Sequence, residues 1–130
     1  MVPNFIVVDD DPVNNLICER TIKLLLPEAD VMTFLHPEVA LAHIKTAYAK
    51  PDSVHAVVFL DINMPALNGW EFLDTFEKFD PSVREKVRIH LLTSSTDKRD
   101  REQAANSKIV LDYWEKPLVR EIVEEVLIKL

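Results

Sequence analysis

Short apolar runs alternate with amphipathic segments along the whole chain. Five runs rich in β-branched and aliphatic residues are typical of strands covered on both faces, as in a parallel sheet flanked by helices. Between these runs, apolar residues recur at the spacing of amphipathic helices. The pattern predicts strands at 5–8, 30–35, 56–60, 87–92 and 109–114, and helices at 12–26, 36–49, 69–79, 97–106 and 118–130.

Regular alternation of five strands with five helices predicts an α/β fold, a doubly wound five-stranded parallel sheet with helices on both faces. The 130 residues fit one domain, 1–130, of ordinary size. The helix at 97–106 is nearly all charged or small. Because it has few apolar anchors, we expect it to be the loosest element.

Composition narrows the class of protein further. Hydrophobic residues make up 48% and charged residues 28% of a chain whose net charge is −7, which argues against direct binding of nucleic acid. Cys18 is the only cysteine, so no disulfide framework is expected. No basic leader precedes the first strand, and every apolar run is shorter than the roughly 18 residues of a spanning helix. We therefore expect no membrane association and a cytoplasmic protein.

Polar residues stand where four of the predicted strands end. They are the pair Asp9-Asp10, then Asp61, Thr93 and Lys116. Because a parallel sheet aligns the carboxyl ends of its strands on one edge, these side chains should converge. Three carboxylates at one place repel one another unless a cation sits among them, and Mg²⁺ is the hard cation that suits one or two carboxylates plus waters. An alternative is that the aspartates only cap the first helix.

Such a set has what phosphoryl transfer to a carboxylate requires. Asp61 supplies a nucleophile, the metal neutralises developing charge, and Lys116 and Thr93 can hold phosphoryl oxygens. The pieces are VVDDD at the first strand end, LDINMP followed by NG at the third, LLTSS at the fourth and YWEKP at the fifth. Together they resemble the receiver domain of two-component response regulators, over Phe5 to Leu130.

The resemblance implies a flavodoxin-like strand order of 2-1-3-4-5 and a role for each matching residue. The aspartate that matches Asp61 takes a phosphoryl group from a histidine kinase or phosphotransfer protein. Catalytic partners of the acceptor are Lys116 and Thr93, the switch residues are Thr93 and Tyr113, and the Lys116-Pro117 bond is expected to be cis. The metal ligands are Asp10 directly, Asp9 through water, Asp61 and the backbone carbonyl of Asn63.

Phosphorylation is expected to change the surface formed by 97–106, the last strand and the last helix, and with it the affinity for a downstream protein or a second copy. Asn63 and Ser95 flank the path of an attacking water and are expected to set the lifetime of the phosphorylated state. The four histidines lack the spacing of a metal site and are predicted at the surface or the sheet edges, and both tryptophans are predicted to pack; these residues are His36, His43, His55, His90, Trp70 and Trp114.

A second function, that of a phosphatase, is also compatible with part of the sequence. Asp9 and Asp11 satisfy the DxDxV spacing of haloacid-dehalogenase-like phosphatases, with Thr93 and Lys116 available for the next two motifs. The acidic metal pair expected after the lysine is absent from 118–130, and Asp61 would go unexplained. A receiver that binds partners without phosphorylation is a third possibility, which the complete residue set disfavours. The sequence therefore predicts a phosphoacceptor module rather than a phosphatase.

Overall fold

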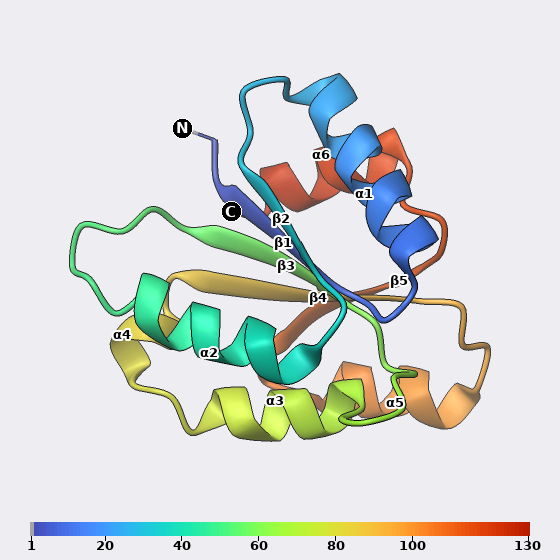
Figure 1. The fold of residues 1–130 in the computed structure, drawn as a ribbon. Coiled ribbons are helices and arrows are strands. Elements are labelled where there is room, and N and C mark those ends of the chain that lie inside the picture. The colour runs from blue at the N-terminus through green and yellow to red at the C-terminus, as the bar shows by residue number, and fades with distance from the viewer. Residues whose placement is uncertain (1) are drawn as a thin grey trace.

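The computed structural model describes residues 2–130 as a five-stranded parallel sheet between two layers of helices (Figure 1). The strand order is β2-β1-β3-β4-β5, as predicted. The strands are β1 (Asn4–Val8), β2 (Val31–Phe34), β3 (Ala56–Leu60), β4 (Val87–Thr93) and β5 (Val110–Glu115), and the helices are α1 (Pro12–Leu25), α2 (Pro37–Ala47), α3 (Gly69–Glu77), α4 (Pro81–Arg84), α5 (Lys98–Asn106) and α6 (Arg120–Ile128).

The two faces of the sheet carry separate cores. Helices α1 and α6 cover one face, and α2, α3 and α5 cover the other (Figure 1). Every residue of β3 is buried, as expected for the central strand of a parallel sheet. Large side chains fill the α1 and α6 side around Phe5 and Phe59, whereas Phe72 and Phe76 of α3 fill the opposite core. The sheet is thus buried on both faces, and the loops that follow its strands lie at its carboxyl edge.

One helix was not predicted from the sequence. The sequence pattern predicts the end of the third helix at residue 79, and Asp80-Pro81, which follow it, begin a four-residue helix, α4. The Asp80 side chain accepts a hydrogen bond from the backbone N–H of Ser82, and Pro81 occupies the first helical turn. An aspartate followed by proline is a helix-start signal as well as a stop signal. Residues 2–130 therefore contain six helices rather than five.

The prediction that all four histidines lie at the surface or the sheet edges was wrong for His90. It lies in the middle of β4, is only 1% exposed, and faces Phe59 and Trp114. The indole N–H of Trp114 donates to Nδ1 of His90 over 3.2 Å. Burial lowers the pKa of His90 to about 4, against the raising effect of Asp112. A neutral imidazole that accepts a hydrogen bond can replace an apolar core residue, and the sequence pattern does not distinguish the two.

Candidate functional site

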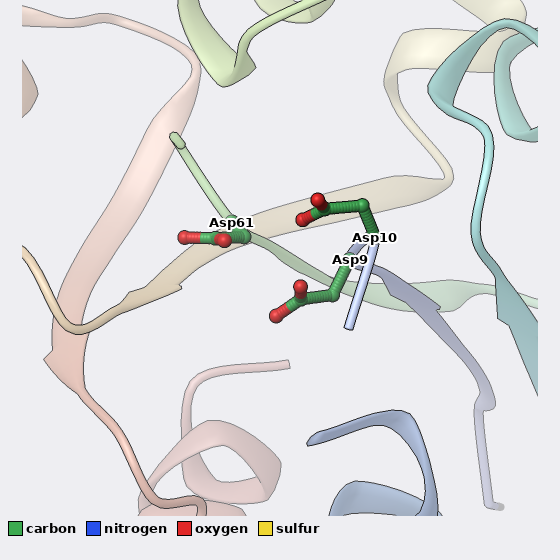
Figure 2. Close-up of side chains that lie close together, drawn as sticks. All are labelled: Asp9, Asp10 and Asp61. Atoms are coloured by element: carbon green, nitrogen blue, oxygen red, sulfur yellow. The ribbon is translucent and has the colours of Figure 1, made fainter. Parts of the chain in front are cut away.

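Three carboxylates meet at the carboxyl ends of β1 and β3. Asp9 and Asp10 follow β1, and Asp61 follows β3, which pairs directly with β1. One oxygen from each of the three lies within 4.8 Å of the others. Figure 2 shows the three side chains extending toward the same space. Asp9 and Asp61 are buried and Asp10 is exposed. Such a concentration of negative charge needs a cation for both buried acids to remain ionised.

Lys116 supplies part of that positive charge. Its Nζ lies 2.6 Å from Oδ2 of Asp9 and 3.4 Å from Oδ2 of Asp61. The Lys116-Pro117 peptide bond is cis, which confirms the prediction. Burial acts to lower the pKa of Lys116, but the hydrogen bond to Asp9 and the charges of Asp61 and Asp9 outweigh burial and raise it. The lysine is therefore held as a cation between the two buried acids.

The carboxylate of Asp9 is fully engaged with protein donors. Oδ1 accepts from the backbone N–H of Asp11 over 2.9 Å, and Oδ2 accepts from Nδ2 of Asn14 over 2.8 Å as well as from Lys116. Burial raises the pKa of Asp9, and the neighbouring charge of Asp61 acts in the same direction, while the hydrogen bonds from Lys116 and Asp11 partly offset them. Asp9 thus has little capacity left for a direct ligand.

Asp61 and Asp10 retain free oxygens. Oδ1 of Asp61 is buried without a hydrogen-bond partner among the described residues, and a buried polar atom of this kind calls for an explanation such as a bound ion, a water or a catalytic role. Asp10 is exposed beside it. Carboxylate oxygens at an open edge suit a hard divalent cation that keeps several waters. The donor set therefore fits Mg²⁺, and Asp10 and Asp61 are the residues with oxygens free to hold it.

Gly69 allows the loop after Asp61 to close tightly. No described glycine has a positive φ, so the backbone conformation does not by itself require glycine here. A Cβ atom on Gly69 would lie 2.8 Å from the carbonyl oxygen of Asp61 and 2.8 Å from Cα of Ile62, so the requirement is for space. Asn68 caps α3 by accepting from the N–H of Glu71, whose side chain accepts from the N–H of Asn68. This capping box fixes the first turn of α3, and the N–H of Gly69 donates to the carbonyl oxygen of Ile62, the residue after Asp61.

Asn63, the predicted carbonyl ligand, lies in this same loop. It follows Asp61 by two residues, and its side chain is exposed. Together with Pro65, Trp70 and Asp100 it lines an open hollow in the loop that follows Asp61. Asn63 is therefore accessible to solvent in this loop.

Thr93 and Tyr113 are joined through one residue. Thr93 ends β4, is fully buried, and its Oγ1 accepts from the backbone N–H of Ser95 over 3.1 Å. The hydroxyl of the half-buried Tyr113 donates to the carbonyl oxygen of Ser95 over 2.9 Å. The two predicted switch residues therefore contact the backbone N–H and the carbonyl oxygen of the same residue, Ser95.

Sequence reasoning missed four side chains that shape the site. Asn14 and Asn15 are buried in the first turns of α1, and Nδ2 of Asn15 donates to the carbonyl oxygen of Asp9 over 3.0 Å. Trp70 and Asp100 contact each other across the loop side of the site. Two consecutive asparagines are poor helix formers. That was the available signal that Asn14 and Asn15 serve the strand end rather than the helix.

Comparison with known proteins agrees with this geometry. The family described as the response regulator receiver domain matches residues 5–127. A response regulator receiver protein from Dyadobacter fermentans has 26% identity and a TM-score of 0.89, covering 98% of this chain and 97% of that one. A two-component response regulator from Cytophaga hutchinsonii has 27% identity and a TM-score of 0.88, covering 98% and 96%. The chemotaxis protein CheY4 of Vibrio cholerae shares the fold at 22% identity, with a TM-score of 0.75 over 99% and 98% of the chains.

A comparison with curated protein sequences gave no match. Within residues 2–130, no helix has the length and apolarity to cross a lipid bilayer.

Proposed function

Because this chain belongs to the response regulator receiver domain family of two-component signalling, we propose that it is a phosphoacceptor module whose acceptor is Asp61. A carboxylate oxygen of Asp61 forms a bond to phosphorus while the bond between phosphorus and a histidine nitrogen of a kinase or phosphotransfer protein breaks. The observation that carries the proposal is the buried Asp61, with one unpartnered oxygen, beside Asp10 and Lys116. In this arrangement, Lys116 and a bound cation would offset the negative charge of Asp61 and of the incoming phosphoryl group.

The chain's own residues divide the work. Asp10 and Asp61, with the carbonyl of Asn63, would hold Mg²⁺, which when bound neutralises charge on the phosphoryl oxygens. Lys116 already lies between Asp9 and Asp61 and would donate to a phosphoryl oxygen. Asp9 stays ordered when that lysine shifts, because Asn14 and the N–H of Asp11 still donate to it.

Thr93 would hydrogen-bond a second phosphoryl oxygen by leaving the N–H of Ser95. Tyr113 would follow, because its hydroxyl holds the carbonyl of the same residue. The surface of α5, β5 and α6 would then change its affinity for a downstream protein or a second copy of the chain. Asn63 and Ser95, which stand two residues after Asp61 and Thr93, would set how fast water removes the phosphoryl group.

A protein donor is supported by the first helix. Val13, Leu16 and Ile17 of α1 are 62%, 48% and 40% exposed and share one helical face by their spacing. This face begins at the residue after Pro12, directly beside the aspartates. Apolar side chains gathered at the mouth of a charged site favour docking of another protein there.

The phosphatase alternative is not favoured by the geometry. That mechanism needs Asp9 as a nucleophile, but both of its oxygens are occupied by donors. It also needs Asp11 as an acid and base, but Oδ1 of Asp11 caps α1 by accepting from the N–H of Val13 over 2.9 Å. Two carboxylates committed to structural hydrogen bonds are poorly placed for a nucleophile and a proton carrier.

The decisive test is incubation with acetyl phosphate and magnesium followed by intact mass measurement. Wild-type protein should carry a single phosphoryl adduct. Asp61→Asn should carry none, because an amide lacks the nucleophilic carboxylate oxygen. Asp52→Asn, in an exposed loop, is the matched control and should behave as wild type. Removing magnesium with a chelator should prevent adduct formation in all three. Repeated hydrolysis that survives Asp61→Asn would instead support the phosphatase.

A further inference from the structure

Helix α5 is held to the molecule by polar contacts rather than by an apolar face. Only one of its nine residues, Ala104, is buried. Helices in proteins normally owe their position to a buried apolar stripe. What fixes α5 over β4 and β5 must therefore be found among its charged side chains.

Asp100 is the side chain of α5 that reaches the body of the protein. Its Oδ2 accepts from the hydroxyl of Ser95 over 2.7 Å, and its Oδ1 accepts from the indole N–H of Trp70 over 3.3 Å. One carboxylate thus joins α5, the loop after β4 and the first turn of α3. All three side chains are half-buried, and hydrogen bonds to a carboxylate are stronger than those between neutral groups.

Ser95 connects this bridge to the phosphoacceptor site. Its N–H donates to Oγ1 of Thr93, its carbonyl oxygen accepts from Tyr113, and its hydroxyl donates to Asp100. A displacement of Thr93 toward a phosphoryl group must therefore move a residue whose side chain is tied to α5. This is a continuous path of hydrogen bonds from the buried strand end to an exposed helix.

Apart from the backbone N–H of Asp97, which precedes α5 and donates to Oγ of Ser95 over 3.3 Å and which Asp97→Ala would keep, the other contacts of α5 do not reach this loop. The guanidinium of Arg101 lies 4.9 Å from the ring centre of Tyr113 and pairs with Glu115, both on β5. Asp97 caps the helix by accepting from the N–H of Arg99, a contact internal to the first turn. Asp100 is the α5 side chain that bonds to the Thr93 loop.

We infer that Asp100 is a positioning residue that couples α5 to the phosphoacceptor site through Ser95. The inference rests on the proposed phosphorylation of Asp61 and adds the route by which it reaches the surface. Loss of Asp100 leaves the acceptor and its ligands in place but removes the side-chain contact between the helix and Ser95.

Hydrogen exchange of the peptide covering residues 98–106 tests this coupling. It is measured in wild type, Asp100→Ala and Asp97→Ala, each with and without acetyl phosphate and magnesium, with the adduct checked by intact mass. Both variants should raise basal exchange because both loosen α5. Only Asp100→Ala should shrink the phosphorylation-dependent change, by about threefold or more, as expected for loss of a coupling contact. Asp97→Ala should keep it.

Further variants separate the two arms of the bridge. Trp70→Phe removes only the bond to α3 and should retain the coupling. Asp100→Asn keeps one acceptor oxygen and therefore one of the two hydrogen bonds. It should weaken the coupling, and it replaces Asp100→Ala in the test if that variant does not fold. An undiminished exchange change in both Asp100 variants, or no change in phosphorylated wild type, would overturn the inference. Absence of the adduct in wild type would instead overturn the proposed function and this inference with it.

Discussion

The two sides of the site are built from different interactions. On the α1 side, Asp9, Asn14 and Asn15 are all buried, and each makes hydrogen bonds inside the protein. On the α5 side, Thr93 is buried, but Asp100 and its partner Ser95 are half-buried and carry a helix that has one buried residue. The first side is fixed by burial, and the second by a few partly hydrated polar contacts.

The α1 side is suited to holding the acidic groups in place, and the α5 side is suited to responding to a change at the site. Acidic groups that must converge on a cation need donors that do not move, and the α1 side provides them. An element that must respond to a ligand is drawn from the less stable parts of a fold. The boundary between the part fixed by burial and the part fixed by polar contacts therefore lies between β4, a strand of the buried sheet, and α5, a helix that packs on the sheet. Three perturbations test where that boundary runs.

The largest expected effect is a pH-dependent loss of stability caused by His90. Because His90 is buried in β4, this strand is assigned to the side that is fixed by burial. Its pKa is lowered to about 4 by burial, and Lys129 adds to the lowering while Asp112 opposes it. The unfolded chain binds a proton below about pH 6.5 that the folded chain refuses, so stability is intact above that pH and falls progressively toward about pH 4. The total loss is about 3 kcal/mol. Urea unfolding across this pH range measures it.

The matched variant for this titration is His90→Asn, whose amide oxygen can replace Nδ1 as acceptor for Trp114. It lacks the titrating ring, so its stability should depend less on pH over the same interval. Equal pH slopes in wild type and variant would mean that His90 protonates freely in the folded state. In that case β4 would open as readily as α5, and the proposed boundary would be wrong.

Asn14→Ala tests the rigid side directly. Oδ2 of Asp9 loses a buried donor at 2.8 Å and keeps only Lys116. Removing a hydrogen bond to a buried charged group destabilises by about 2 kcal/mol. Because α1 and β1 belong to the global fold, the loss should appear in urea unfolding of the whole protein. Asn106→Ala, an exposed asparagine at the end of α5, is the control and should leave stability nearly unchanged. Equal effects would remove the distinction between the sides.

Much of this architecture follows from sequence. Five apolar runs predicted all five strands to within one or two residues, and parallel pairing placed the residues after β1, β3, β4 and β5 at one edge. The convergence of Asp9, Asp10 and Asp61 needed only that topology. The weak anchoring of α5 was also predicted, because a helix without an apolar stripe is visible in its letters. These features depend on periodicity and strand ends, which a single sequence displays.

The remaining features depend on contacts between distant elements. Asn14 looks like an ordinary helix residue until β1 is placed beneath it, and His90 reads as polar until Trp114 is seen donating to it. The bridge from Asp100 to Trp70 joins residues thirty positions apart, on neighbouring helices. Such pairs are fixed by how two elements are rotated against each other. Hydrophobic patterning shows which face of an element is buried, but not which individual side chains meet across the contact.

The smallest expected effect sharpens the comparison on the α5 side. Arg101 lies over the ring of Tyr113 and pairs with Glu115, and the side chains of Arg101 and Glu115 are largely exposed. Exposed cation–ring contacts and ion pairs each contribute about 0.5 kcal/mol. Arg101→Gln removes both contacts, about 1 kcal/mol together, so it should raise local exchange of α5 only about fivefold and leave global unfolding unchanged. Arg101→Lys keeps the charge, so it should recover most of the ion pair, which is the part of the effect that added salt screens. A global loss of stability in Arg101→Gln would show that α5 unfolds with the sheet, and would place it on the same side of the boundary as α1.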